Sequence, residues 1–285
     1  MTPKTRKILF YFSILAFFLM GALVLSFALG FRYDFQTNRL IKTGSIVVKA
    51  NVSAKIYIDD QLEGETSFFD STFSKKNLLP GKYNLKVQKE GYHTWQKDVD
   101  VEEGLVSYFE SVFLVKRELK EEVILSGEIL EKHLKSQKPL PEAAASFNLP
   151  QKGVVDFSIS SDGSSVVWVT SHEVWVSWNK DINYQPVRKA GEKKLVTRLS
   201  GSVKKVYWHK NGSHVFLRLG AEFLMLETDT RGGINTNTIY GNLGAKDIVW
   251  YDSDLDRIFK YQNSGLPAGQ AGLPAGQAGL TAAEL

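Results

Sequence analysis

The chain has 285 residues, of which 43% are hydrophobic and 23% charged, and its 35 basic and 31 acidic side chains give a formal net charge of +4. It contains no cysteine, which excludes disulfide bridges and cysteine-based metal sites. The net charge is small and no Lys/Arg cluster lies beyond the N-terminal flank, so the composition argues against a nucleic-acid-binding protein.

The first predicted element is an apolar run over residues 8–31 that contains no charged side chain. As a helix it would extend about 36 Å, enough to cross a hydrocarbon core of about 30 Å. The run is apolar on all faces, whereas the core-facing helix of a soluble domain keeps a polar stripe. The sequence therefore predicts a transmembrane anchor, preceded by a short cytoplasmic tail at residues 1–7.

Two questions about this anchor stay open. A cleaved signal peptide would have a shorter apolar core followed by small residues, and Ser26 and Ala28 offer only a poor cleavage site. The orientation is weakly determined, because Lys and Arg are almost equally frequent on the two sides of the span. Since the short basic tail is the easier end to keep in the cytoplasm, we predict a single-pass protein of the cell membrane. Its N-terminus is then cytoplasmic and its C-terminal domains are extracytoplasmic.

A polar connector, residues 32–44, leads to strand patterning over residues 45–117. Tyr83, Leu85 and Val87, for example, alternate with polar residues, as in a strand with one buried and one solvated face. About six short strands in a segment of this length predict a small all-β sandwich.

This segment resembles the PEGA domain, a small β-sandwich of prokaryotic surface-layer and envelope proteins. The resemblance rests on three landmarks in a fixed order: residues 52–66 (VSAKIYIDDQLEGET), residues 78–83 (LLPGKY) and residues 87–92 (VQKEGY). Two residues depart from the family pattern, since Asp60 stands where the family has glycine and Ser67 where it has proline. The resemblance implies a non-catalytic attachment or interaction module.

Residues 118–150 break the strand pattern with a Glu- and Lys-rich stretch followed by prolines, and we predict a linker with one short helix. Strands return over residues 151–263, where two hairpins carry Asp-Gly at 162–163 and Asn-Gly at 211–212. Such pairs favour the type I′ turn, which matches the twist of the flanking strands.

These two turns lie about 50 residues apart, which is the length of a four-stranded propeller blade. The region resembles the blades of WD40-like or TolB-like β-propellers, where turns of this kind recur. It holds about two and a half blades, whereas a closed propeller usually has at least four. The predicted fold class is therefore mainly β: an N-terminal single transmembrane helix, a small PEGA-like β-sandwich, and then a partial β-propeller.

The last segment, residues 264–285, has low complexity and repeats the heptapeptide GLPAGQA. It lacks the patterning of a strand or an amphipathic helix, so we expect it to be disordered. We interpret it as the truncated or frame-shifted end of a longer propeller protein. A collagen-like role is disfavoured because glycine does not recur at every third position.

Four sets of side chains could in principle carry chemistry. They are a group of acids (Asp59, Asp60, Glu63, Glu65, Asp70), two histidines (His209, His214), three aspartates (Asp252, Asp254, Asp256) and six tryptophans (Trp95, Trp168, Trp175, Trp178, Trp208, Trp250).

A structural role is favoured for each set. The five acids cluster in a turn, where acids are usually solvated. The histidines lack an obvious third metal ligand, and the three aspartates lack the glycine and glutamate of a calcium loop. The tryptophans alternate with polar residues, which indicates core positions rather than a sugar-binding surface. We assign no catalytic, cofactor-binding or metal-binding residue and expect no cofactor.

The sequence thus predicts a membrane-anchored, non-enzymatic envelope protein that presents β-domains to a protein or a cell-wall glycan. The expected partners are the lipid bilayer and an envelope protein or glycan, and no nucleic acid. One alternative is a sensory or regulatory membrane protein that acts through a partner. Another is a fragment of a larger envelope enzyme.

Overall fold

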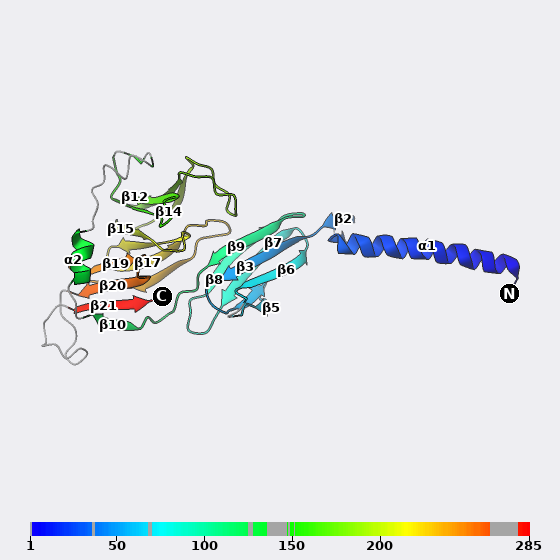
Figure 1. Ribbon diagram of the computed structural model, residues 1–285, viewed down its shortest axis with the longest axis horizontal. Helices are drawn as coiled ribbons and strands as arrows, with labels where there is room; N and C mark the ends of the chain where they lie inside the picture. The colour runs from blue at the N-terminus through cyan, green and yellow to red at the C-terminus, as the bar shows by residue number, and fades with distance from the viewer. Residues whose placement is uncertain are drawn as a thin grey trace. The chain divides into compact units, whose positions relative to one another are not determined.

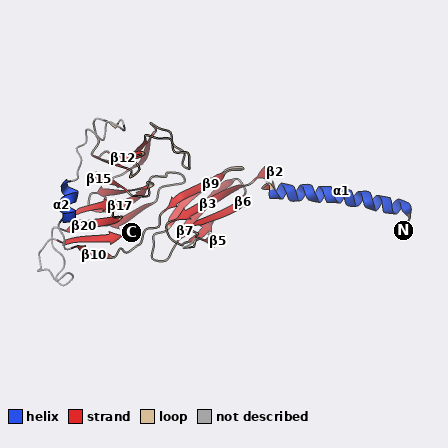
Figure 2. Cartoon of the chain, viewed as in Figure 1, coloured by secondary structure: helices blue, strands red, loops and turns tan. Residues whose placement is uncertain are grey.

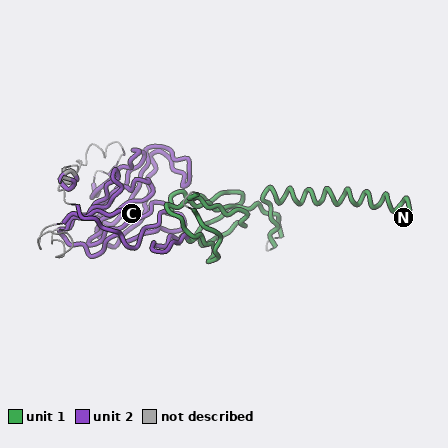
Figure 3. The backbone as a smooth tube through the Cα atoms, turned by 60° about the horizontal axis from the view of Figure 1, so that its bottom comes forward, with its two compact units in different colours: residues 1–86, 98–112 green, residues 87–97, 113–285 purple. Residues whose placement is uncertain are grey.

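The computed structural model describes residues 2–35, 38–67, 70–124, 128–135, 147, 149–150, 152–262 and 279–285. The chain divides into two compact units (Figure 3). Unit 1 comprises residues 1–86 and 98–112, and unit 2 comprises residues 87–97 and 113–285.

The N-terminal helix of unit 1, α1 (Pro3–Ala28), contains most of the predicted apolar run (Figure 1). Thr2 caps it, accepting a hydrogen bond from the Thr5 N–H at 3.4 Å, and proline occupies the first turn, where its missing N–H costs nothing. None of its side chains is buried, and its length and mean hydropathy of 2.6 suit a membrane span. The helix ends a few residues before the predicted limit, because Gly30, with φ +86°, turns the chain into a strand.

The predicted connector is not merely a linker, because it folds into a two-stranded hairpin. Its strands are β1 (Phe31–Asp34) and β2 (Arg39–Lys42). Alternating side chains in each strand divide between the two faces of the hairpin.

Seven further strands form two sheets, as expected for a small sandwich. One sheet has the order β6-β3-β9 and the other β5-β4-β7-β8, with these bounds: β3 (Gly44–Ala50), β4 (Lys55–Ile58), β5 (Gln61–Glu65), β6 (Thr72–Leu78), β7 (Gly81–Gln88), β8 (Trp95–Val101) and β9 (Val106–Val112). Alternation of side chains holds closely in β3, where Ile46 and Val48 are fully buried. β3 pairs antiparallel with β6 and parallel with β9.

The tight turn between β4 and β5 consists of Asp59 and Asp60, which have φ of 50° and 64°. Positive φ at both central residues is the signature of a type I′ hairpin turn. The glycine that the family pattern has at position 60 would adopt this conformation without steric cost, whereas an aspartate does so less readily.

Unit 2 contains three four-stranded antiparallel sheets, so the chain is mainly β (Figure 2). The first sheet has β11 (Asp156–Ile159), β12 (Ser165–Val169), β13 (Glu173–Trp178) and β14 (Lys193–Arg198) in chain order. The second has β15 (Val203–Trp208), β16 (His214–Leu219), β17 (Glu222–Glu227) and β18 (Thr236–Tyr240), also in chain order.

The third sheet takes its strands from distant parts of the chain. Its order is β10-β21-β20-β19, with β10 (Glu121–Ile124), β19 (Ile248–Asp252), β20 (Arg257–Gln262) and β21 (Gly279–Glu284). Two expectations are corrected here, since the linker over 118–150 contributes β10 and the tail over 264–285 contributes β21. The physical reason is that β20 offers an unpaired edge and an apolar face, which Leu280 and Ala282 help to cover.

Parts of the predicted linker also cover the outer faces of two sheets. Ile129 and Leu130 of α2 (Glu128–Lys135) pack against the cluster that contains Trp250, and the His133 ring stacks on Trp250 at a centroid distance of 4.4 Å. On the first sheet, Phe147 and Leu149 pack against Val166 and Trp168. Apolar faces of terminal sheets are thereby removed from water.

The Asp-Gly and Asn-Gly turns differ from the predicted type I′ geometry. Positive φ occurs at Gly163 and Gly212, both at +66°, but not at the preceding Asp162 and Asn211. In each turn the glycine N–H donates to the carbonyl three residues before it, at 2.9 and 3.0 Å. These are five-residue connections, 160–164 and 209–213, in which a left-handed glycine follows a type I turn. The Asp162 and Asn211 side chains accept hydrogen bonds from N–H groups two residues ahead.

Candidate functional site

The most concentrated group of buried polar side chains in the described part of unit 2 begins at Lys97. Strand β8 alternates buried and exposed positions, and Trp95, Lys97, Val99 and Val101 all fall on its buried face. Lys97 is only 1% exposed. Burying an ammonium group costs free energy unless a counter-charge and hydrogen bonds compensate it.

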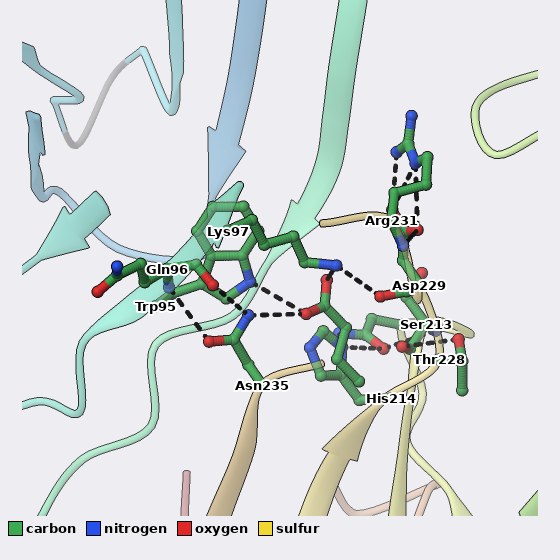
Figure 4. A network of polar contacts seen from close by, with 11 residues as sticks. Trp95, Gln96, Lys97, Ser213, His214, Thr228, Asp229, Arg231 and Asn235 are labelled. Atoms are coloured by element: carbon green, nitrogen blue, oxygen red, sulfur yellow. Dashed lines mark hydrogen bonds and ion pairs between the residues drawn. The ribbon is translucent and has the colours of Figure 1, made fainter. Parts of the chain in front are cut away.

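The counter-charge is Glu227 at the end of β17. The Lys97 Nζ lies 3.2 Å from Glu227 Oε1, and the two side chains are 0% and 5% exposed. The other carboxylate oxygen, Oε2, accepts hydrogen bonds from Trp95 Nε1 at 3.3 Å and from Asn235 Nδ2 at 3.0 Å (Figure 4). Lys97 also donates to the backbone carbonyl of Asp229. Each charged group of the pair is therefore hydrogen-bonded as well as neutralised.

Asn235 additionally holds the backbone of Gln96 within unit 2. The Gln96 N–H donates to Asn235 Oδ1 at 3.1 Å, and Asn235 Nδ2 donates to the Gln96 carbonyl at 3.3 Å. The amide side chain thus supplies the donor and acceptor that a neighbouring strand would supply. Residues 95–97 are fixed by side-chain contacts and by this backbone-like pairing together.

A second carboxylate near this pair, that of Asp229, is held by Arg231. Arg231 donates from Nη2 to Asp229 Oδ2 at 2.7 Å and from Nε to both carboxylate oxygens, and its Nη1 donates to Gln185 Oε1 at 2.8 Å. Burial alone would raise the pKa of Asp229, but the hydrogen bonds from Arg231 and the charges of Lys97 and Arg231 outweigh it and lower that pKa.

The pKa of Glu227 is raised by burial, with Lys97 and the Asn235 hydrogen bond opposing the shift. A raised carboxyl pKa is a property that general acids share. Here, however, the carboxylate is 4% exposed and occupied by three side-chain partners. The arrangement stabilises the packing of residues 95–97 within unit 2, and the partners of the carboxylate leave it no open position for a substrate.

The two histidines considered in the sequence lie close together beside this network. Their ring centroids are 6.3 Å apart, and the Phe113 ring lies 4.8 Å from His209 and 5.6 Å from His214. Burial lowers the pKa of both, to about 3 for His214, so both are neutral near pH 7. The His214 Nδ1 lies 3.0 Å from the Asn211 Nδ2.

A metal ion would need a third ligand at this place. The Asp256 carboxylate approaches one of the two histidines, with its Oδ1 3.6 Å from His209 Nε2. This carboxylate already accepts a hydrogen bond from the Tyr251 hydroxyl at 2.7 Å and pairs with Lys210 at 2.7 Å. Among the residues described, no three His, Cys, Asp or Glu side chains gather in a way that would hold a metal ion.

The acids of the β4–β5 region do not form a shared site, because several have separate partners. Asp59 accepts from the Asn84 N–H at 2.8 Å and Asp70 from the Thr72 N–H at 3.0 Å, while Asp60 pairs with Lys86 and Glu63 with Lys75. In the other acidic group, Asp252 accepts from the N–H groups of Asp254 and Leu255 and so closes its own turn. These are the solvated or turn-capping roles expected from the sequence.

The tryptophans occupy the core positions that their alternation indicated. Four are at most 5% exposed: Trp95, Trp168, Trp208 and Trp250. Trp175 and Trp178 are partly buried, and Trp175 stacks on Trp168 with a centroid distance of 5.3 Å and an interplanar angle of 4°. Stacking between neighbouring strands stabilises the sheet and leaves these ring faces covered.

Comparison with known families identifies the sandwich formed by strands β3 to β9. Residues 43–112 match the PEGA domain family. This segment is a PEGA domain. The match covers the three landmarks that carried the resemblance in the sequence, and the PEGA domain is therefore confirmed together with the mainly β fold class.

Several solved structures match this chain, with TM-scores of 0.30 or less. The β-propeller domain of Cps50 (Swd1) from Myceliophteria thermophila has 13% identity and a TM-score of 0.29, over 39% of this chain and 36% of that one. Hsv2 from Kluyveromyces lactis has 11% identity and a TM-score of 0.30, over 67% and 61%. A luciferin-regenerating enzyme has 11% identity and a TM-score of 0.30, over 90% of each chain.

This chain spans about two fifths or less of the first two matched structures, a nidogen/laminin complex and the Swd1 domain. No match was found among curated proteins. Similarity at this level supports no inference about activity or ligand.

The network at Lys97 is not predicted from the sequence, although the sequence contains one indication of it. Lys97 is a residue of the PEGA domain that interrupts the apolar series Trp95, Val99 and Val101 on the buried face of β8. A lysine at an inward position of an alternating strand requires a buried acid as its partner. No pattern could have shown that the acid is Glu227, because the two lie far apart in sequence.

Proposed function

We propose that this protein is a membrane-anchored, non-catalytic protein of the cell envelope. Its PEGA domain and propeller-type sheets would bind an envelope protein or a cell-wall glycan. The observation that carries the proposal is α1, whose apolar side chains are exposed along its whole length. In water so large an apolar surface would be unfavourable, whereas a bilayer covers it.

The described polar clusters support a binding role rather than a catalytic one. In each, the charged groups with the greatest burial are satisfied by internal partners, as at Lys97 and Glu227. A catalytic group needs contact with substrate, which such internal pairing denies. The presence of a PEGA domain agrees with an attachment or interaction module.

Membrane topology can be tested with single cysteines, because the native chain has none. Ser161→Cys in an exposed turn of unit 2 and Thr5→Cys near the N-terminus would be treated with a membrane-impermeant maleimide in intact cells. We expect labelling of Cys at 161 and protection at 5 until the membrane is permeabilised. The opposite pattern would contradict the proposed orientation. Release of the chain by alkaline carbonate would contradict the anchor.

Binding can be tested with the full chain in lipid nanodiscs. Sedimentation with purified cell-wall glycan, and crosslinking to envelope proteins in intact cells, separate the two kinds of partner. Retention on the glycan pellet, abolished by soluble glycan fragments, would support a glycan partner, and a specific crosslinked product would support a protein. If neither is obtained and the chain turns over an envelope substrate, the non-catalytic proposal fails.

A further inference from the structure

The hairpin that follows α1 has one apolar and one charged face. In its register Tyr33 pairs with Leu40 and Asp34 with Arg39. Side chains alternate between the faces of a strand, so the paired Tyr33 and Leu40 share one side. Phe35 follows β1 in the turn, and its ring contacts the Tyr33 ring. Asp34 and Arg39 project from the other side.

The apolar face of this hairpin is open to solvent in the protein alone. Phe35 is 84% exposed, Leu40 64% and Tyr33 48%. The Tyr33 and Phe35 rings contact each other edge to face, with centroids 5.1 Å apart. Three large exposed apolar side chains on one face of a short hairpin indicate a surface that another phase or molecule covers.

The hairpin is joined directly to the last turn of α1. The Arg32 guanidinium lies over the Phe27 ring, 3.1 Å from its centroid. The Gly30 carbonyl accepts two hydrogen bonds from Thr43, from its N–H and its hydroxyl, both at 2.8 Å. These contacts hold the base of the hairpin at the end of the helix.

We propose that the face formed by Tyr33, Phe35 and Leu40 lies on the lipid bilayer, at the boundary between headgroups and acyl chains. The helix has 26 residues and is about 39 Å long, which exceeds a hydrocarbon core of about 30 Å. Its C-terminal turn is therefore at the level of the headgroups when the apolar centre spans the core. The hairpin begins at that level.

Lipid suits the chemistry of this surface. Tyrosine and other aromatic side chains are enriched at membrane interfaces, where an apolar ring meets a hydrated headgroup layer. Exposed basic side chains accompany the apolar face, Lys42 on the same side and Arg39 on the other, and both can approach lipid phosphates. The inference rests on the membrane anchor of the proposed function and adds a second contact with the bilayer.

The test uses single-cysteine variants of the full chain, each labelled with the environment-sensitive dye NBD. Tyr33→Cys, Phe35→Cys and Leu40→Cys report on the apolar face, Arg39→Cys on the opposite face, and Val24→Cys on α1. The proteins are placed in nanodiscs of phosphatidylcholine and phosphatidylglycerol that contain a lipid with a shallow spin label. Spin-labelled lipid quenches dyes in the membrane, and iodide quenches dyes in water.

We expect the dyes at positions 33, 35 and 40 to emit at shorter wavelength, to be quenched by the spin-labelled lipid and to be protected from iodide. The dye at position 39 should show more iodide quenching and less lipid quenching. If lipid quenches position 24 while iodide quenches positions 33, 35 and 40, the anchor is inserted and the hairpin proposal is overturned. Protection of those positions from both quenchers would overturn it in favour of a protein contact. If lipid does not quench position 24, the anchor itself fails and both proposals fall.

Discussion

The two units complete their sheets over very different distances along the chain. The sheets of the PEGA domain are built from strands that all lie within residues 43–112. The third sheet of unit 2 instead places β10 and β21 side by side, although the other two four-stranded sheets of the unit lie between them in sequence. Alternation of side chains shows which face of a strand is buried, but it does not name the neighbouring strand. Long-range pairing is therefore where sequence patterns lose their predictive value.

The contrast can be tested first at the buried ion pair that joins residues 97 and 227. Lys97→Met leaves the Glu227 carboxylate buried without its cation, and we expect the free energy of unfolding to fall by about 3–5 kcal/mol. Chemical denaturation of the nanodisc-held chain, followed by tryptophan fluorescence, measures this loss.

The control is the exposed pair of Lys86 with Asp60 in the PEGA domain, where Lys86→Met should cost no more than about 1 kcal/mol. Lys97→Met combined with Glu227→Gln should recover part of the loss, because the unpaired charge is gone. Equal effects of Lys97→Met and Lys86→Met would contradict the importance of burial.

The second test concerns β21. Leu280 is 6% exposed and packs in the cluster with Trp250 and Phe259. Leu280→Ala should lower the free energy of unfolding by about 2–5 kcal/mol, because it leaves a cavity. Hydrogen exchange of the β20 amide groups should accelerate as well. Leu62→Ala in β5, where the side chain is 58% exposed, is the matched control and should change stability by less than about 0.5 kcal/mol.

The third test uses pH. The pKa of His214 is lowered by burial, and by the charges of His209 and Lys97, from 6.5 to about 3 in the folded chain. The unfolded chain therefore binds more protons below pH 6.5, and the contribution to stability that is present above pH 6.5 is lost as the pH falls toward 3. The loss should be about 1.4 kcal/mol for each pH unit in this window.

His214→Gln removes this titration, so the free energy of unfolding of the variant should depend less steeply on pH between 6.5 and 5 than that of the wild type. Urea denaturation at several pH values gives both slopes. Equal slopes for the wild type and the variant would show that His214 has the same pKa in the folded and the unfolded chain, which would contradict the prediction.

The smallest effects are expected in the turns. Gly163→Ala places a side chain at φ +66° where no atom lies within 4 Å of the added Cβ, so the cost of about 1 kcal/mol is purely conformational. Gly241→Ala also meets no atom within 4 Å but lacks a positive φ, and it should not destabilise the chain. Thermal unfolding distinguishes the two, and equal costs would contradict the conformational explanation.

The turn of the PEGA domain should respond in the opposite direction. Asp60→Gly relieves a left-handed aspartate, and we expect a gain of at most about 1 kcal/mol after the loss of the exposed pair with Lys86. A clear loss of stability in the same thermal assay would mean that the ion pair outweighs the backbone conformation.

Much of the fold could be predicted because its signals are local. The apolar run predicted α1, and the landmarks around Gly81 and Gly91 identified the PEGA domain. The hairpins at Gly163 and Gly212 were located correctly, but their turn type was wrong. An Asp-Gly pair favours type I′ only in a two-residue loop, whereas these connections have five residues and place the side chains of Asp162 and Asn211 on backbone N–H groups.

The remaining features depend on contacts between distant segments. Residues 121–124 are two glutamates followed by Val123 and Ile124, too short a run to predict a strand, yet they pair with β21 because its edge is available. The Gly279–Glu284 segment follows a low-complexity repeat, and its short run of Leu, Thr and Ala is apolar enough to be buried only in a sheet that already exists. The alternation in β8 indicates that Lys97 is buried, but nothing in the sequence indicates that Glu227 is its partner.

The wide separation of β10 and β21 also sets an order of events during synthesis. Until residues 279–284 have left the ribosome, β20 has no partner on that edge, and the apolar side chains of Trp250 and Phe259 lack part of their cover. An unpaired strand edge beside an apolar face is a ready template for association with other chains. Pairing of residues 279–284 with β20 thus ends a period in which the nascent chain is open to association at this edge.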